Sequence, residues 1–170
     1  MDDLDTPRPH PVRSFLTMML STAALALVLN QVVGWWRAPD LPDMAPDFAV
    51  TTTTGEALQL SSLRGQVVVL NFWATWCGPC KLEAPFFASF AEANPDVMVL
   101  GLAEDDQVGL VRATMAQLGI AYPVALADDA LLATYGVHTF PTTVVVNPDG
   151  SVRAAHVGML SRPQLWAMTR

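Results

Sequence analysis

The sequence is poor in positive charge. Its 170 residues include 9 Lys and Arg residues against 16 Asp and Glu residues, which gives a formal net charge of −7 at pH 7. Lysine occurs once, as Lys81, and acids and arginines balance within residues 1–37, so the rest of the chain carries the whole negative charge. Nucleic-acid binding needs a basic footprint on the protein surface. The composition therefore argues against a nucleic-acid partner.

Cysteine is scarce as well, because the chain contains only Cys77 and Cys80. A structural zinc site usually needs about four Cys or His ligands at short spacings, whereas His10, His138 and His156 are scattered along the chain. We therefore predict no metal site. A purely structural disulfide is also disfavoured, because so short a loop removes little entropy from the unfolded chain.

The two cysteines are well placed for redox chemistry. They lie in the sequence WCGPC at residues 76–80, directly after the apolar run 67–73, which predicts a buried strand. A helix that starts there surrounds Cys77 with unpaired backbone N–H groups, which favour a thiolate. We expect Cys77 to be the attacking sulfur and Cys80 the resolving sulfur that releases a mixed disulfide. The disulfide is then the redox group, and no separate cofactor is expected.

Residues 14–36 form one uncharged stretch between Arg13 and Arg37. As a helix, this stretch is roughly 34 Å long at 1.5 Å per residue, enough to cross a bilayer. It predicts a transmembrane anchor in contact with lipid, and the alternative is a cleaved signal peptide. Because Arg8 and Arg13 precede the stretch, the positive-inside rule places residues 1–13 in the cytoplasm. The rest of the chain then faces a compartment such as a bacterial periplasm, where disulfides are exchanged.

Residues 37–46 contain three prolines and indicate a Pro-rich linker, after which we predict one domain over residues 47–170. In this domain, strand-length apolar runs alternate with amphipathic helical segments, which indicates an α/β fold. The predicted strands are 48–52, 57–60, 67–73, 97–103, 142–146 and 152–157, and the predicted helices are 78–92, 107–118, 130–135 and a final one opened by a Ser161–Gln164 capping box.

Three motifs in this order resemble the thioredoxin fold: WCGPC after a strand, Pro85 eight residues beyond the first cysteine, and the sequence FPT at 140–142. The resemblance covers about residues 48–166. An extra segment at 104–122, Glu83 on the active-site helix and the N-terminal anchor are similar to the membrane-anchored TlpA/ResA-like branch. That branch is related to the cytochrome c maturation and copper-stress oxidoreductases. The resemblance implies a mixed sheet flanked by helices, with an N-terminal β-hairpin and a central insertion.

Glu83 follows Cys80 by three residues, so both lie on one face of the predicted helix. A carboxylate there accepts the proton of the resolving thiol if partial burial raises its pKa. The alternative is a solvated surface glutamate paired with Lys81. Asn71 favours the first interpretation, because thioredoxins carry a buried Asp at the resembling position and Asn cannot take a proton. Glu83 is therefore the third candidate catalytic residue.

The resemblance also implies a substrate-binding surface around the disulfide. Pro141 is cis in this family and lies across from the cysteines, where it would expose the backbone of Phe140 to β-type pairing with an incoming chain. Phe140 is larger than the usual residue before this proline, and core packing is the alternative role for it. Trp76, Gly78 and Pro79 complete the predicted surface, because they border the reactive sulfur.

Together these features predict an exported, membrane-anchored enzyme that reduces specific protein disulfides and is recharged by a membrane thiol relay. The Gly-Pro pair between the cysteines resembles reducing thioredoxins. The alternatives are a periplasmic disulfide oxidant and a Cu(I)-binding metallochaperone that uses the same cysteines with His138. A peroxidase is disfavoured, because peroxiredoxins carry Thr three residues before the reactive cysteine and this chain carries Ala74.

Overall fold

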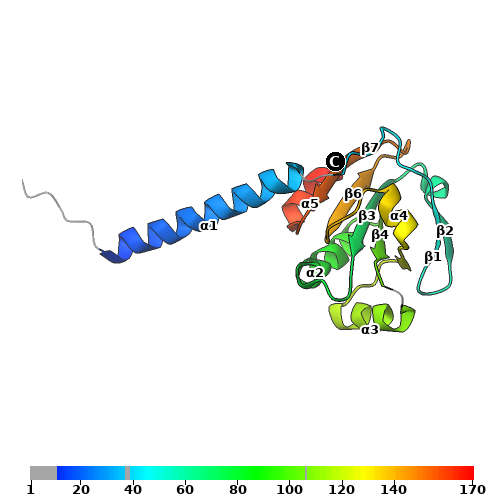
Figure 1. Cartoon of the computed structure of the whole chain (residues 1–170), viewed down its shortest axis with the longest axis horizontal. Helices are drawn as coiled ribbons and strands as arrows, with labels where there is room; N and C mark the ends of the chain where they lie inside the picture. The colour runs from blue at the N-terminus through cyan, green and yellow to red at the C-terminus, as the bar shows by residue number, and fades with distance from the viewer. Residues whose placement is uncertain (1–10, 37–38, 106) are drawn as a thin grey trace, which may run out of the picture. The chain divides into compact units, whose positions relative to one another are not determined.

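The computed structural model of this protein describes residues 11–36, 39–105 and 107–170. The chain divides into two compact units, Met1–Trp36 and Arg37–Arg170. Among the described residues, the first unit contains one helix, and the second contains a five-stranded sheet, a two-stranded hairpin and the remaining helices (Figure 1). Most of the predicted cytoplasmic tail and the first two linker residues lie outside the described residues.

The first unit is the helix α1, Pro11–Trp36. Large apolar side chains along it, such as Phe15 and Leu20, are exposed. Within the described part of the chain, however, no helix combines the length and the hydropathy needed to cross a membrane. The predicted transmembrane anchor at 14–36 and its contact with the bilayer are therefore not confirmed. In the sequence, Asn30 and Gln31 interrupt the apolar run near its C-terminal end.

The second unit is built on a sheet with the strand order β5-β4-β3-β6-β7 (Figure 1). Strands β3, β4 and β5 run parallel, whereas β6 is antiparallel to β3 and β7 is antiparallel to β6. This mixed α/β sheet confirms the predicted thioredoxin-like architecture. The strands are β3 Val67–Trp73, β4 Val97–Ala103, β5 Val124–Leu126, β6 Thr142–Val146 and β7 Val152–Val157.

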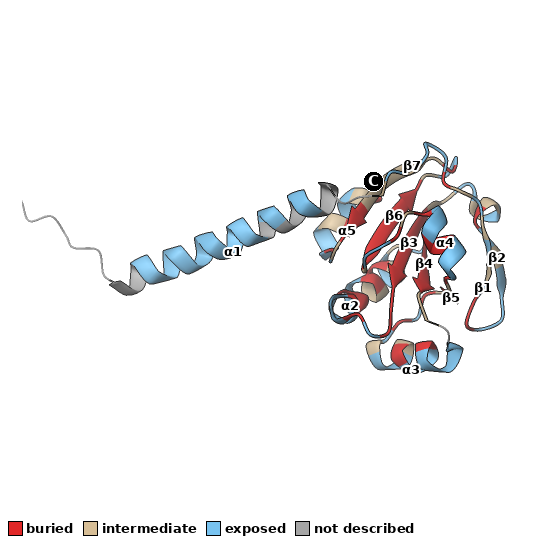
Figure 2. Ribbon diagram, in the orientation of Figure 1, coloured by how far each residue is buried: buried red, intermediate tan, exposed pale blue. Residues whose placement is uncertain are grey.

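The flanking α-helices are α2 Gly78–Ala93, α3 Val108–Leu118, α4 Asp129–Thr134 and α5 Arg162–Met168. Because side chains alternate along a strand, β3 contributes to two separate cores. Val69 and Trp73 pack in a core with α2, α3 and α5, on what we call the α2 face of the sheet. Leu70 and Phe72 pack in a core with α4, on the α4 face. Figure 2 shows that β3, β4 and β6 are buried along most of their length.

The chain enters the second unit beside the start of β7. The N–H of Ala45 donates to the carbonyl of Gly150 at 3.0 Å, and the N–H of Val152 donates to the carbonyl of Asp43 at 2.8 Å. The hairpin of β1 (Ala49–Thr51) and β2 (Ala57–Gln59) and a 3-10 turn (Leu60–Leu63) follow. The other end of β7, around His156, has no further strand beside it among the described residues.

Most of the predicted elements are confirmed. The four longer strands of the sheet match their predicted limits, and the hairpin and the helices match to within one or two residues. Strand β5 was not predicted, because three residues are too few to show a period. Its position is fixed instead by parallel pairing with β4, which no local pattern encodes.

Candidate active site

The disulfide lies where β3 has ended and α2 begins. Cys77 occupies the N-cap position of α2, and its Sγ accepts a hydrogen bond from the N–H of Cys80 at 3.2 Å. The two sulfurs are bonded at 2.05 Å, with their Cα atoms 5.3 Å apart. Pro79 stands in the first turn, where its missing N–H costs no helical hydrogen bond. A thiolate at Cys77 therefore meets the unpaired N–H groups and the positive end of the α2 dipole.

Both sulfurs belong to buried residues, while exposed residues border them. Cys77 is 4% exposed and Cys80 is 2% exposed, whereas Trp76 is 67% exposed. Gly78 and Pro79 are exposed as well. The structure therefore brings three of the predicted substrate-binding residues together around the disulfide.

Phe140 joins this surface from the loop before β6. Its ring lies edge-on to that of Trp76, with the ring centroids 5.8 Å apart and an interplanar angle of 80°. Phe140 is half-buried and also packs against both cores, so the surface and core interpretations both hold in part. The peptide bond between Phe140 and Pro141 is cis, as predicted. The carbonyl of Pro141 accepts a hydrogen bond from the N–H of Gly158 at 2.8 Å.

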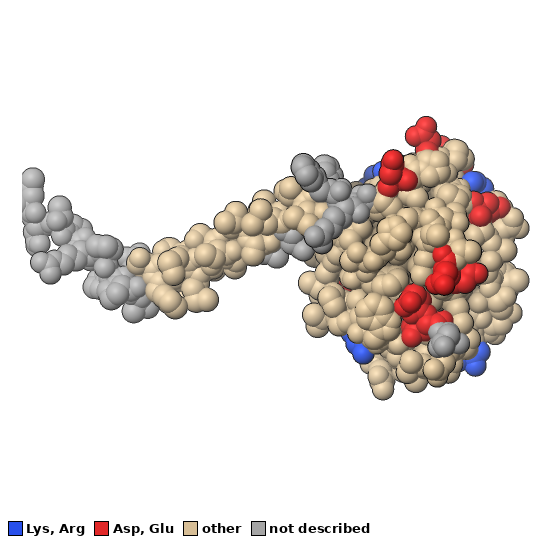
Figure 3. Space-filling model, viewed as in Figure 1, with Lys and Arg blue, Asp and Glu red and all other residues tan. Residues whose placement is uncertain are grey.

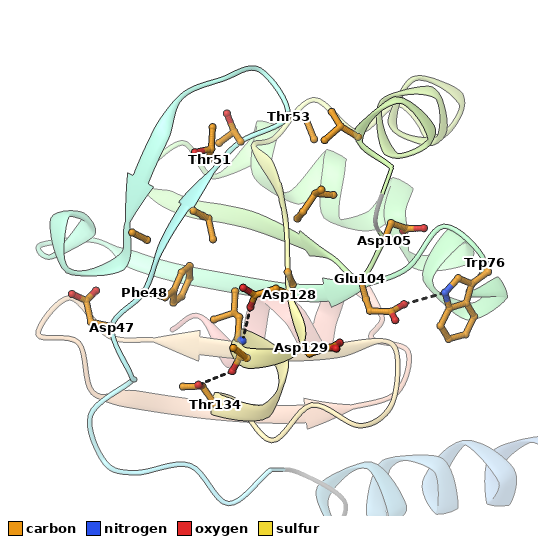
Figure 4. Close-up of a pocket in the computed structure, with 18 residues that line it drawn as sticks. Asp47, Phe48, Thr51, Thr53, Trp76, Glu104, Asp105, Asp128, Asp129 and Thr134 are labelled. Carbon is orange, nitrogen blue, oxygen red and sulfur yellow. Dashed lines mark hydrogen bonds between the residues drawn. The ribbon is translucent and has the colours of Figure 1, made fainter.

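Two acidic residues that follow β4 hold the cysteine loop in place. The N–H and the hydroxyl of Thr75 donate to the carboxylate of Asp105 at 3.0 and 2.7 Å. The indole N–H of Trp76 donates to Glu104 Oε2 at 3.1 Å (Figure 4). The sequence alone indicates only a solvated acidic loop at these positions. Parallel pairing of β3 and β4 would have indicated their role, because it brings the carboxyl ends of both strands, and so these acids and the cysteine loop, to one edge of the sheet.

A cleft of about 1170 Å³ begins at Trp76 and runs along β1 and the start of α4 (Figure 4). Its described lining includes Asp47, Glu104, Asp128 and Asp129 but no Lys or Arg. Figure 3 likewise shows acidic side chains gathered on the visible face of the second unit, with basic ones at the margins. The surface next to the disulfide is therefore negatively charged.

Glu83 lies one turn beyond Cys80 on α2 and is only 1% exposed. Its Oε1 accepts a hydrogen bond from Asn71 Nδ2 at 3.1 Å, and its Oε2 accepts one from the N–H of Leu160 at 2.9 Å. Burial raises the pKa of Glu83 to about 7, and the two hydrogen bonds oppose this shift. The burial excludes the surface pairing with Lys81. The Glu83 carboxyl therefore exchanges its proton near neutral pH, as a general base or acid requires.

Aromatic residues pack close to Glu83. Burial, and to a lesser degree the charge of Glu83, raise the pKa of the Tyr122 phenol, which keeps it protonated. A Cβ atom on Gly101 would lie 2.8 Å from Val124 Cγ2 and 3.2 Å from Trp73 Nε1. Only glycine therefore leaves room for the indole and the phenol beside this part of β4.

Comparison with known proteins places this site in a family. Residues 41–155 match the AhpC/TSA family. The chain belongs to the AhpC/TSA family. It is 30% identical over 159 residues to the thiol-disulfide oxidoreductase ResA of Bacillus subtilis (strain 168), and this match covers 91% of the chain and 88% of that relative.

Solved structures of similar proteins also belong to thiol-disulfide exchange proteins. A putative thiol:disulfide interchange protein DsbE from Chlorobium tepidum is 30% identical with a TM-score of 0.70, covering 78% of this chain and 100% of that one. A secreted Mycobacterium tuberculosis disulfide oxidoreductase is 29% identical with a TM-score of 0.66, covering 72% of this chain and 93% of that one. This member of the AhpC/TSA family is therefore a thioredoxin-like thiol-disulfide oxidoreductase.

One position bears on which chemistry of the family this chain performs. Ala74, three residues before Cys77, is fully buried. Peroxiredoxins resemble this region but carry Thr there, and an alanine has no hydroxyl to hydrogen-bond a peroxide. The residues next to the sulfurs therefore favour disulfide exchange over peroxide reduction.

Proposed function

We propose that this protein reduces specific disulfides of exported proteins outside the cytoplasm. The observation that carries the proposal is the Cys77–Cys80 disulfide at the start of α2, with a buried carboxyl, Glu83, one turn further along the same helix. The thiolate needed for attack is favoured at the helix N-terminus. The carboxyl supplies a proton acceptor for the second thiol.

Reduction proceeds in two exchange steps. The Cys77 thiolate attacks one sulfur of the substrate disulfide, so a bond from Cys77 to that sulfur forms and the substrate S–S bond breaks. The other substrate sulfur leaves with the electron pair as a thiolate. Cys80 then gives its proton to Glu83 and attacks Cys77 Sγ, which releases the first substrate sulfur and closes the Cys77–Cys80 bond. Two electrons pass from the protein dithiol to the substrate.

The substrate chain docks on the exposed surface around the sulfurs. Trp76 and Phe140 present two rings in edge contact, and Gly78 and Pro79 leave the approach to Cys77 open. The acidic cleft that continues from Trp76 favours substrates with positive charge near their cysteines. Heme-attachment cysteines of apocytochromes c are the substrate class that the sequence resemblance suggests.

Each turnover leaves the protein oxidised, so it needs an electron donor. We assign this role to a membrane thiol relay that reduces the Cys77–Cys80 disulfide by the same exchange chemistry. The compartment that we propose is the one outside the cytoplasmic membrane, where substrate disulfides persist. The name of the secreted M. tuberculosis relative supports this location.

The redox midpoint of Cys77–Cys80 tests the direction of the reaction. The purified full-length chain is equilibrated in glutathione buffers, free thiols are alkylated, and the oxidised fraction is read by mass. A midpoint more negative than about −220 mV, toward the thioredoxin value, supports a reductase. A midpoint above that value, toward the roughly −120 mV of strong oxidants, overturns the proposal in favour of disulfide formation.

Labelling in intact cells tests the location. A membrane-impermeant maleimide should label Cys77 after mild reduction of whole cells or spheroplasts, with a cytoplasmic single-cysteine protein as the control. Labelling that appears only after the cells are lysed contradicts a site outside the cytoplasm.

A further inference from the structure

A row of polar residues crosses the α2 face of the sheet. Asn71 of β3 is paired with Thr143 of β6, and Thr143 is paired with His156 of β7. Paired residues in neighbouring strands point to the same face, about 5 Å from one strand to the next. Figure 1 shows the three strands side by side. We call Asn71, Thr143 and His156 the polar row.

The polar row is buried in an otherwise apolar core. Asn71 is 3% exposed, Thr143 is fully buried, and His156 is 2% exposed. Neither Thr143 Oγ1 nor His156 Nε2 has a hydrogen-bond partner among the described residues. A buried polar atom without a partner typically costs about 1–3 kcal/mol. Packing alone does not account for two such atoms on paired positions of adjacent strands.

The polar row starts at the catalytic carboxyl and ends at the edge of the sheet. Asn71 Nδ2 donates to Glu83 Oε1 at 3.1 Å. Glu83 itself is 1% exposed, so its proton has no direct access to solvent. At the other end, β7 is the last strand, and the segment that covers its start pairs with Gly150 and Val152 rather than with His156.

The side chains have the chemistry that proton transfer needs. A threonine hydroxyl donates one hydrogen bond and accepts others, and an imidazole binds a proton at one nitrogen while it releases one from the other. An asparagine amide does not titrate, so Asn71 positions the Glu83 carboxyl instead of carrying charge. Burial lowers the pKa of His156, so its imidazole is neutral at pH 7 and is free to accept a proton.

We propose that Thr143 and His156 form the path by which Glu83 exchanges its proton with solvent at the β7 edge. The proposal rests on the proposed function, because it gives Glu83 its proton from Cys80. The Glu83 carboxyl passes that proton by way of the Thr143 hydroxyl to His156 Nε2, and water carries it between these groups, because neither atom has a direct hydrogen-bond partner among the described residues. The imidazole releases a proton from its other nitrogen to water beyond β7. No electrons move in this step, and Glu83 returns to its carboxylate form.

The groups that face Glu83 are neutral. Facing Glu83 are the Asn71 amide from β3, the N–H of Leu160 that follows β7, and the protonated Tyr122 phenol from the segment before β5. At His156, burial lowers the pKa of the imidazole. The rate of proton exchange at Glu83 therefore reports how fast the proton moves along the path.

The test measures that exchange rate directly. The full-length chain is labelled with ¹³C at the Glu side-chain carboxyl carbon, and the Glu83 signal, identified by its loss in Glu83→Gln, is followed by NMR through its titration near pH 7. Line shapes then give the proton exchange rate. His156→Gln keeps a hydrogen-bonding atom near the Nε2 position but does not bind or release a proton. Thr143→Val keeps the shape of the side chain but removes the hydroxyl. Thr114→Val is the control for a buried Thr-to-Val change, on α3.

We expect both path variants to slow proton exchange at Glu83 at least tenfold, with its titration midpoint almost unchanged and the control equal to the wild type. Imidazole added to the buffer should restore part of the rate in His156→Gln. A wild-type exchange rate in either path variant, or equal slowing in the control, overturns the proposal. Should one path variant fail to fold, the other decides the question by the same criterion.

The resolving step separates this proposal from the proposed function. The reduced chain reacts with an aromatic disulfide at Cys77, and Cys80 then expels the second aromatic thiol in a single turnover. This step only moves a proton from Cys80 to Glu83, so its rate should be unchanged in His156→Gln. A resolving rate that is also normal in Glu83→Gln contradicts the role of Glu83 in the proposed function, and with it the reason for the path.

Discussion

The two faces of the same sheet differ in how they treat polar groups. On the α4 face, the buried Tyr135 hydroxyl donates to the carbonyl of Pro46 at 2.6 Å, and the Thr142 hydroxyl donates to the carbonyl of Thr139 at 2.7 Å. Among the described residues, three of the four buried polar atoms without a partner belong to the α2-face residues Trp73, Thr143 and His156, and the fourth is Arg153 Nη1 at the bulge of β7. The α4 face is built for stability. The α2 face gives up stability around the disulfide and the buried Glu83 carboxyl.

The largest expected effect comes from removing the reactive sulfur on the α2 face. Cys77→Ser leaves a hydroxyl at the N-cap, which still caps α2 but does not form a thiolate. We expect disulfide-exchange activity to fall below detection while the circular dichroism spectrum stays that of the wild type. Residual exchange activity in Cys77→Ser would show that Cys80 can attack on its own, against the assigned roles.

On the α4 face, a core substitution should cost stability and leave the chemistry intact. Phe72 is fully buried there and packs on Tyr135, with the ring centroids 5.4 Å apart. Phe72→Ala should lower the free energy of unfolding by about 3–5 kcal/mol. Denaturant titration measures the loss, and the redox midpoint of the folded fraction should not move. A shift of that midpoint would mean that the two faces are not independent.

On the α2 face, the stability itself should depend on pH through Glu83. Its pKa is raised from 4.5 to about 7 in the folded protein, so folding favours the protonated carboxyl. The stabilising contribution of the protonated Glu83 carboxyl is fully present below pH 4.5 and is lost as pH rises through about 7. At 1.36 kcal/mol per pKa unit, the free energy of unfolding changes by about 3 kcal/mol over this range.

A comparison of the wild type with Glu83→Gln isolates the pH-dependent contribution of Glu83 to the free energy of unfolding. His156, with its lowered pKa, acts in the opposite sense, because its contribution is lost as pH falls below its unfolded value near 6.5. Both proteins share that effect, so the difference in unfolding free energy between them should change between pH 4.5 and 8 as Glu83 alone predicts. A difference that is flat with pH would refute the raised pKa.

The same substitution should slow catalysis while the fold persists. In Glu83→Gln, Cys80 loses its proton acceptor, and general-base catalysis is typically worth about 100-fold or more. We expect the single-turnover resolving rate at pH 7 to fall by about 100-fold and to recover as pH rises toward the ordinary thiol pKa near 8.5. Stopped-flow release of the aromatic thiol gives this rate, and a profile parallel to that of the wild type from pH 6 to 9 would rule the role out.

The smallest effect should come from a satisfied hydroxyl on the α4 face. Tyr135→Phe removes the donor to Pro46 and leaves that carbonyl without its partner, which should cost about 1 kcal/mol. Thermal unfolding measures this loss, with the resolving rate as the control for the other face. A change in the resolving rate larger than twofold would count against the division between the faces.

The sequence predicted the local features of this site better than the long-range ones. The strands β3 and β4 were found because each is an unbroken apolar run, and the cysteine pair was found because its spacing is local. Glu104 and Asp105 were missed as supports of the cysteine loop, since their contacts depend on two strands that pair in parallel across about 30 residues. Local patterns do not encode such pairings.

The polar row shows the same limit. Asn71, Thr143 and His156 are far apart in the sequence, and only the sheet register brings them to one face. The predicted transmembrane anchor at 14–36 stays a prediction, because no spanning helix is found among the described residues.

The pairing of the entering chain with the start of β7 has a mechanical consequence. A pull on the N-terminal segment first loads the hydrogen bonds of Ala45 with Gly150 and of Asp43 with Val152. Between β7 and the disulfide strand β3 lies the whole of β6. Tension on the segment therefore reaches the domain at its edge, two strands away from the strand that leads to the sulfurs. A load on this segment therefore acts first on hydrogen bonds that do not involve the redox centre.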